Sequence, residues 1–334
     1  MCCIGAQWMM IIRGNVMKAV YLDYQSLDKN DLDFSGLHAV FDELILYPST
    51  SQEQLIERIQ HVDVIISNKV QLSAAMLTHC TQLKLILISA TGTNNIDLAQ
   101  ATQQGVTVCN CQGYGTAAVA QHTLMLMLNL ATSFRQYDRA VQQGNWNTSS
   151  QFCLLDFPII ELSGKTLGLV GYGELGKAVA KLAHAFGMRV MIASLPNRPE
   201  MAERVPLSEL LPQVDFLSLH CPLTPDTQDL IDAKALSQMK KSAFLINCAR
   251  GGIVSEQALA DALCSGEIAG AATDVLTVEP PKAGNVLLDS SIPNLIITPH
   301  SAWGSVDARQ RIVQQMIENT EAFKAGLAIR KVNG

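Results

Sequence analysis

Three polar side chains follow apolar runs of the sequence and together could act on a carbonyl group. They are Arg250, Glu279 and His300. A histidine can donate a proton at neutral pH, and a neighbouring carboxylate can hold the tautomer needed for that step. An arginine can bind the carboxylate of an acid and polarise a carbonyl oxygen. Each residue alone would more often be structural or solvated, but the set as a whole predicts carbonyl reduction.

A glycine-rich loop points to the source of the electrons. The segment Gly171-Tyr172-Gly173-Glu174-Leu175-Gly176 lies between a predicted strand, 166–170, and a predicted helix, 175–186. In this context the first glycine permits a tight turn, the second lets the backbone approach a pyrophosphate, and the third lets helix and strand pack closely. The helix N-terminus would then face the phosphates with free N–H groups. The alternative is a turn that merely tolerates glycine.

The end of the next predicted strand, 189–193, bears on the identity of the dinucleotide. An acid there would bind the adenosine ribose of NAD, but the position holds Ser194. Arg198 follows shortly, and an arginine near the ribose 2′ position accommodates the phosphate of NADP. Arg198 could instead point to solvent. The sequence therefore predicts NAD or NADP as cofactor, with tolerance of NADPH.

Alternating strand-like and helix-like runs must position these residues. Such alternation is typical of parallel, doubly wound sheets. In the C-terminal half the predicted strands are 166–170, 189–193, 216–219, 243–247, 269–273 and 295–298, and the helices are 175–186, 206–211, 234–239 and 256–264. In the first third the strands are 18–22, 62–66, 83–89 and 106–109, and the helices are 52–59 and 74–80. A long helix is predicted over 116–143, and an amphipathic helix over 306–324 ends the chain.

One loop of the first third could bind an anion. Thr91-Gly92-Thr93 follows the apolar run 83–89, and its backbone N–H groups could form a nest for a substrate carboxylate. An ordinary strand-to-helix loop is the alternative.

The bulk properties argue against several classes of protein. The chain has 334 residues, of which 48% are hydrophobic and 16% charged, so it has room for two packed domains and does not resemble a disordered protein. A net charge of −6 without a Lys/Arg cluster argues against a nucleic-acid partner. The most apolar internal run, 124–130, is far shorter than the roughly 20 residues of a membrane span.

The cysteines and the N-terminus complete this picture. Nine cysteines, an odd number, are scattered along the chain, which indicates reduced thiols and a cytoplasmic location. Cys109 and Cys111 lack a second pair at zinc-site spacing, so no metal site is predicted. Residues 1–16 are predicted to be a leader outside the fold, because a natural first strand begins only after Met17.

From Met17 onward the chain resembles the D-isomer-specific 2-hydroxyacid dehydrogenases over nearly its whole length. The segments that carry the resemblance are SATGTNNID, NCQGYGTAAVAQHT, GLVGYGELGKAVA, LHCPLT, INCARGG, ATDVLTVEPP and ITPHSAWGS, in the family's order and with similar spacing. GYGTAAVAQHT and TPHSAWGS are most similar to the glycerate dehydrogenase, or hydroxypyruvate reductase, branch of the family. The absence of an acid at Ser194 departs from many members.

The resemblance implies a role for each candidate residue. His300 would be the proton donor, Glu279 its partner, and Arg250 the group that holds the keto acid. Substrate contacts would also come from the amides of Thr91, Gly92 and Thr93 and from Trp303. The implied cofactor contacts are Thr116, Gly171, Gly173, Glu174, Leu175, Gly176, Ser194, Arg198, Cys221, Pro222, Thr227, Asn247, Cys248, Ala249, Asp274 and His300, with Asp274 on the nicotinamide carboxamide.

The resemblance also implies an architecture. A flavodoxin-like substrate domain would comprise 17–113 and 302–334, a Rossmann NAD(P)-binding domain would comprise 114–301, and the active site would lie in the cleft between them. A homodimer is expected, with its interface at the helix that begins near Thr116. The implied reaction is hydride transfer from NAD(P)H to a small 2-keto acid, hydroxypyruvate first and glyoxylate second.

Two other functions stay open at this point. Another 2-keto acid could be preferred, or the chain could be a nucleotide-sensing, corepressor-like binding protein on the same fold. Formate oxidation is disfavoured, because the related formate dehydrogenases would have glutamine at position 279.

Overall fold

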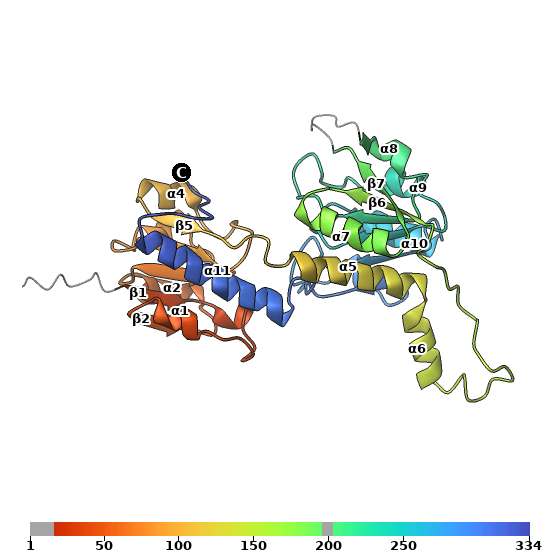
Figure 1. Ribbon diagram of the computed structural model, residues 1–334, viewed down its shortest axis with the longest axis horizontal. Helices are drawn as coiled ribbons and strands as arrows, with labels where there is room; N and C mark the ends of the chain where they lie inside the picture. Colours follow the sequence, from red (N-terminus) through yellow and green to blue (C-terminus); the bar gives the residue numbers. More distant parts are fainter. Residues whose placement is uncertain (1–16, 196–202) are drawn as a thin grey trace, which may run out of the picture. The chain divides into compact units, whose positions relative to one another are not determined.

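The computed structural model describes residues 17–195 and 203–334 and divides them into two compact units (Figure 1). The first comprises the described residues up to Tyr114 together with Val306–Gly334, and the second comprises Gly115–Ser305. The second unit extends past residue 301, where the sequence places the boundary, because Ala302 packs into its core. The predictions about residues 1–16 and about Arg198 concern residues outside the described ranges.

The first unit contains a five-stranded parallel sheet in the order β2-β1-β3-β4-β5. This is the flavodoxin-like strand order 2-1-3-4-5. Its strands are β1 Lys18–Tyr21, β2 Glu43–Leu46, β3 Val64–Ser67, β4 Leu85–Ile88 and β5 Thr107–Cys109. Every residue of β3 and β4 is buried, as expected for central parallel strands that are covered on both faces.

Helices cover both faces of this sheet. They are α1 Ser35–Ala39, α2 Gln52–Ile59, α3 Ala74–Leu77, α4 Leu98–Gln103 and α11 Val306–Lys324, together with the short 3₁₀ helix η1 Tyr24–Ser26. Buried residues of α2, α3 and α4 share one core cluster with β1, β3, β4 and β5. The C-terminal helix α11 contacts α1 and β4. Arg309 of α11 donates two hydrogen bonds to the Asp31 carboxylate, at 2.7 and 2.6 Å, which fastens this last helix to the first third of the chain.

The second unit contains a seven-stranded parallel sheet in the order β12-β11-β10-β9-β6-β7-β8. Counted from β6, this is the Rossmann order 3-2-1-4-5-6 with one further strand. The strands are β6 Thr166–Val170, β7 Arg189–Ala193, β8 Arg204–Val205, β9 Phe216–Leu219, β10 Phe244–Asn247, β11 Gly270–Thr273 and β12 Leu295–Ile297.

Two core clusters lie on opposite faces of this sheet, because alternate strand residues point to opposite sides. Leu217 and Leu219 of β9 belong to the cluster that includes α8 Leu207–Leu210, α9 Ala233–Ser237, α10 Glu256–Cys264 and the 3₁₀ helix η2 Val286–Leu288. Phe216, one residue away, belongs to the cluster that includes α5 Thr116–Ala131 and α7 Glu174–Ala185.

The single helix predicted over 116–143 is wrong, because two helices occupy this segment. They are α5 and α6, the latter spanning Phe134–Gln142. Ser133 between them has a left-handed backbone with φ of 49°, and its hydroxyl donates to the Pro158 carbonyl oxygen at 2.6 Å. The break follows Thr132, where hydroxyl side chains compete with the helical hydrogen bonds. In Figure 1, α6 turns away from the line of α5.

Two further observations concern membrane spans and thiols. Within 17–195 and 203–334, no helix is both long enough and apolar enough to cross a membrane. Cys109 and Cys111 are buried, and burial raises the pKa of their thiols to about 11 and about 12. Both thiols are therefore protonated at neutral pH and behave as small apolar side chains.

Candidate active site

The three glycines of the loop after β6 differ in how much space surrounds their backbone. Gly171 has φ of 100°, and a Cβ placed on it would lie 2.6 Å from the backbone nitrogen of Cys221. A Cβ on Gly176 would lie 2.3 Å from the Gly171 carbonyl oxygen. A Cβ on Gly173 would meet no atom within 4 Å. The fold itself therefore requires Gly171 and Gly176, whereas Gly173 leaves open space at its backbone.

That open space lies at the start of α7. Gly173 is the N-cap of this helix and brings no side chain to its first-turn N–H groups, so they can bind an anion. The Thr116 hydroxyl donates to the Glu174 carboxylate at 2.6 Å, which joins the starts of α5 and α7. The space beside Gly173 is therefore open and lies next to a helix N-terminus. Such a place suits the pyrophosphate of a dinucleotide, which must come close to the backbone.

The other expected cofactor residues lie at the carboxyl ends of β7, β9 and β10. Ser194 follows β7, and its N–H donates to the Val205 carbonyl oxygen at 2.7 Å. Cys221 and Pro222 follow β9, where the Thr227 hydroxyl donates to the Pro222 carbonyl oxygen at 2.7 Å and thereby closes the turn. After β10 the turn 247–250 is closed by Asn247, whose Oδ1 accepts from the Ala249 N–H at 3.0 Å; Cys248 within it is buried.

Asp274, at the end of β11, organises the loop that carries His300. Its buried carboxylate accepts hydrogen bonds from the Thr298 hydroxyl at 2.6 Å and from the backbone N–H groups of Ser301 and Ala302, both at 2.9 Å. Its carbonyl oxygen accepts from the His300 N–H at 2.8 Å. His300 itself has φ of 53°, a conformation that costs energy for a side chain with a Cβ. Charge-assisted bonds to one carboxylate thus hold a strained backbone in place.

His122 of α5 joins the same network, which sequence reasoning missed. Its Nε2 lies 3.0 Å from the Thr298 hydroxyl and 3.6 Å from the Asp274 carboxylate. Both partners are far from it in the sequence, so only the AQHT segment quoted for the family resemblance could have drawn attention to it.

His300 and Glu279 form a pair. Nδ1 of His300 lies 2.5 Å from Oε2 of Glu279, while Oε1 of Glu279 accepts from the Leu276 N–H at 2.8 Å. Burial by itself would raise the pKa of Glu279, but the bonds from His300 and Leu276 and the nearby charges of His300 and Arg250 lower it below its usual value. Glu279 is therefore a carboxylate at neutral pH. The two side chains keep 37% and 32% exposure, so a ligand can reach them.

Arg250 follows β10 and is close enough to Glu279 for their charges to interact. Its charge contributes to the lowered pKa of Glu279, and its guanidinium donates to the Ala249 carbonyl oxygen at 2.7 Å. A Cβ on the next residue, Gly251, would lie 2.0 Å from the Leu276 carbonyl oxygen, so the Arg250 and Glu279 loops touch backbone to backbone. The second unit thus brings Arg250, Glu279 and His300 to neighbouring strand ends, although 50 residues separate the first from the last.

Another histidine, His220 at the end of β9, differs in its environment. Burial lowers its pKa to about 4, so it is neutral at physiological pH. Its Nε2 pairs with the Ser218 hydroxyl at 2.9 Å, and its buried Nδ1 has no hydrogen-bond partner in the described part of the chain. An imidazole that stays neutral and enclosed is a poor proton donor, which favours His300 for that role.

The expected substrate residues of the first unit lie in an exposed loop after β4. The Thr91 hydroxyl donates to the Cys111 carbonyl oxygen at 2.9 Å, and Asn110 donates to the Thr91 carbonyl oxygen at 2.8 Å. A Cβ on Gly92 would meet no atom within 4 Å. The loop is therefore anchored at Thr91 and open at Gly92. Trp303, in the second unit, is partly buried against that unit's own core, next to Gly115.

Comparison with known proteins agrees with this geometry. Residues 124–302 match the family model for the NAD-binding domain of D-isomer specific 2-hydroxyacid dehydrogenases. Glycerate dehydrogenase of Methylorubrum extorquens is 45% identical over 310 residues, which cover 92% of this chain and 96% of the relative. The chain belongs to the D-isomer-specific 2-hydroxyacid dehydrogenase family.

Other members of the family match it at similar length. Hydroxypyruvate reductase of Blautia hydrogenotrophica is 37% identical, with 95% of this chain and all of the relative covered. The crystal structure of the TT0316 protein from Thermus thermophilus superposes with a TM-score of 0.81 at 32% identity, covering 93% of this chain and 98% of that one. The sequence-based expectations of two parallel-sheet domains, a nicotinamide cofactor and a dehydrogenase are confirmed.

The glycine loop yields a first prediction. In Gly173→Val the new side chain enters open space, so the fold and the melting temperature stay as in the wild type, but the side chain occupies the place expected for the pyrophosphate. The Kd for reduced cofactor should rise roughly tenfold or more, equivalent to about 1.4 kcal/mol. Fluorescence titration measures the Kd. Gly171→Ala is the contrast, because its Cβ collides with backbone and should lower the melting temperature; unchanged cofactor binding in Gly173→Val would contradict the assignment.

Proposed function

We propose that this dehydrogenase reduces hydroxypyruvate to D-glycerate with NADH or NADPH, and that glyoxylate is a second substrate. The observation that carries the proposal is the His300–Glu279 pair at 2.5 Å, with Arg250 near enough for its charge to lower the pKa of Glu279. The substrate assignment is supported by the relatives that match over almost the whole chain, which are a glycerate dehydrogenase and a hydroxypyruvate reductase.

His300 would serve as the acid of the reaction. When bound, the reduced nicotinamide supplies a hydride to the 2-keto carbon, and the electron pair of the C=O π bond moves to oxygen. Nδ1 of His300 faces Glu279, so Nε2 is the nitrogen left to donate a proton to that oxygen. After this transfer His300 is a neutral imidazole whose remaining N–H is on Nδ1.

Glu279 would keep His300 ready for this step. An ionised carboxylate only accepts hydrogen bonds, so it selects the imidazole form with hydrogen on Nδ1. The lowered pKa of Glu279 keeps it ionised across the neutral range, so it remains a hydrogen-bond acceptor for Nδ1 of His300. In the reverse direction the same pair would accept the proton of the hydroxy acid.

Binding of a 2-keto acid requires N–H groups that donate hydrogen bonds to its carboxylate. We assign this role to Arg250, which offers a planar fork of N–H groups, and to the backbone N–H groups of the loop Thr91-Gly92-Thr93. The openness of that loop at Gly92 supports the assignment. Glu279 in place of glutamine keeps formate oxidation disfavoured.

We also propose that the enzyme accepts both nicotinamide cofactors. A carboxylate that binds the two ribose hydroxyls of NAD would repel the 2′-phosphate of NADP, and the residue that follows β7 is Ser194. Within the part of β7 and its loop that the structure describes, 189–195, there is no acidic residue.

A homodimer is the proposed assembly. We define residues 134–159 as the apolar arm. It exposes a group of large apolar side chains, which is unusual on the surface of a monomeric protein. They are Phe134 at 57%, Val141 at 47%, Trp146 at 51%, Phe152 at 89%, Leu155 at 77% and Ile159 at 55% exposure. We therefore propose an interface at this arm, further along the chain than the start of α5 at Thr116, where the sequence-based prediction put it. A second copy that covers the arm would remove this apolar area from water.

The first test concerns activity and the acid. Wild-type enzyme should oxidise NADH or NADPH with hydroxypyruvate and, more slowly, with glyoxylate, as followed by cofactor absorbance, with pyruvate as the comparison substrate. His300→Asn should lower kcat by roughly 10² to 10⁴-fold, the contribution of general acid catalysis, while the Kd for cofactor stays unchanged. His184→Asn, an exposed histidine of α7, is the control. Full turnover in His300→Asn would exclude the role.

The second test concerns cofactor choice. Ser194→Asp introduces the carboxylate that is missing after β7, so it should lower kcat/KM with NADPH at least about tenfold relative to NADH. Steady-state kinetics with both cofactors measure the ratio. An unchanged ratio would mean that Ser194 does not face the ribose.

The third test concerns assembly. The double variant Phe152→Asp, Leu155→Asp should convert a dimer into a monomer, because two charges replace apolar side chains that the second copy would cover. Light scattering gives the mass in solution. Leu327→Asp, which changes an exposed leucine of the first unit, should leave the dimer intact. A monomeric wild type would contradict the proposal.

A further inference from the structure

Glu256, the first residue of α10, connects the two ends of the loop that carries Glu279. Its Oε1 accepts from the Thr277 N–H at 2.7 Å, and its Oε2 accepts from the Asn285 side-chain amide at 2.8 Å. Glu279 lies between these two contacts in the sequence. The Glu256 carboxylate therefore bridges the start and the end of the loop 277–285.

The contacts of this bridge extend to rigid elements on both sides. Oδ1 of Asn285 accepts from the Leu287 N–H at 2.9 Å and so begins the 3₁₀ helix η2, whose Leu287 is buried in the core. On the other side Glu256 is part of α10, and Leu259 and Leu263 on that helix are buried in the same core cluster. Glu256 thus ties the loop to two elements that the core holds in place.

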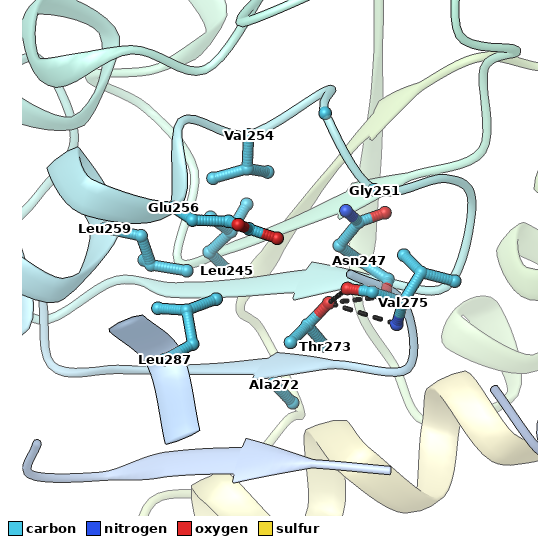
Figure 2. Close-up of a pocket in the computed structure, with 11 residues that line it drawn as sticks. Leu245, Asn247, Gly251, Val254, Glu256, Leu259, Ala272, Thr273, Val275 and Leu287 are labelled. Carbon is cyan, nitrogen blue, oxygen red and sulfur yellow. Dashed lines mark hydrogen bonds between the residues drawn. The ribbon is translucent and has the colours of Figure 1, made fainter. Parts of the chain in front are cut away.

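Glu256 also lines a small pocket. Figure 2 shows Glu256 among the residues that line this pocket, beside apolar side chains such as Val254 and Leu259. The bond from Asn285 to this carboxylate is partly buried, and hydrogen bonds to charged groups are stronger than those between neutral groups.

A second constraint acts at the start of the same loop. The backbone of Gly251 lies against Leu276 and Thr277 so closely that a Cβ would be 2.4 Å from the Thr277 nitrogen. The N–H of that same Thr277 donates to Glu256. Because the Leu276 N–H in turn donates to Oε1 of Glu279, two consecutive amides connect Glu256 to Glu279.

We propose that Glu256 is a positioning residue for the proton-transfer pair: it holds the loop that aims Glu279 at Nδ1 of His300. It touches neither His300 nor Arg250 through any hydrogen bond in the described residues, so it acts through Glu279. The proposal rests on the proposed function, in which Glu279 orients the acid of the reaction.

The test compares Glu256→Ala with Asp261→Ala, which removes an equal charge from the same helix without contacting the loop. The Asp261 carboxylate accepts only from the neighbouring Gln257 side chain among the bonds of the described structure, at 2.9 Å. Glu256→Ala should lower kcat by roughly ten- to a hundredfold, the cost of misplacing a catalytic group, while KM for the cofactor stays unchanged.

A double-mutant cycle separates positioning from a general structural effect. In the Glu279→Gln background Glu256→Ala should cost little further activity, because the group that it positions is already disabled. Glu256→Gln, which can still accept from Thr277 but not from Asn285, should fall between wild type and Glu256→Ala. Equal losses of kcat in both backgrounds, or wild-type kinetics in Glu256→Ala, would overturn the proposal.

Hydrogen exchange keeps this result distinct from a failure of the proposed function. If wild type reduced no keto acid, the proposed function would fail, yet backbone amides of 276–285 should still exchange faster in Glu256→Ala than in wild type or Asp261→Ala. Unchanged exchange in that segment would refute the positioning role by itself.

Discussion

The buried carboxylate of Asp274 is the interaction on which the geometry of the site depends. It accepts three hydrogen bonds from Thr298, Ser301 and Ala302, and together they shape the loop that puts His300 into a left-handed backbone conformation. Hydrogen bonds to charged groups contribute about 1.5–3 kcal/mol each, enough to offset the cost of such a conformation. The direction of the His300 side chain toward Glu279 follows from this loop. The family resemblance predicts that Asp274 contacts the cofactor, and in the structure its carboxylate holds the loop that carries His300.

Close backbone contacts place the remaining parts of the site. Parallel strands end at one edge of the sheet, so the loops after β6, β9, β10, β11 and β12 are neighbours. The backbone of Gly171 lies against His220, which follows β9, and the backbone of Gly251 lies against Leu276. A side chain at either glycine would force two of these loops apart. The glycines therefore set the spacing of the loops that carry the proposed cofactor and proton-transfer groups, and side-chain hydrogen bonds such as those of Glu256 fix the course of those loops.

Much of the fold could be predicted from the sequence, because most elements have their apolar residues at regular intervals. The bounds of α2, β7, β9, α10 and α11 agree with the ranges expected from the sequence alone. The strand β2, Glu43–Leu46, was missed although Leu44, Ile45 and Leu46 are apolar, because a four-residue run does not by itself distinguish an edge strand from a loop. The break between α5 and α6 was missed because apolar residues continue on both sides of it. It is decided by Ser133, whose hydroxyl bonds to a carbonyl 25 residues away.

The sequence by itself determined the family and the nicotinamide cofactor, and it predicted Arg250, Glu279 and His300 as the reactive residues. These inferences rest on the types and order of residues, which do not depend on the geometry of the fold. The glycine spacing that suggested a dinucleotide is likewise a property of the sequence. Only the tertiary structure showed that Gly171 and Gly176 are needed for packing while Gly173 leaves open space. It also decided that His300, and not His220, has an ionised carboxylate as partner. These distinctions depend on which backbone atoms lie within a few ångströms, and residues far apart in the chain supply those atoms.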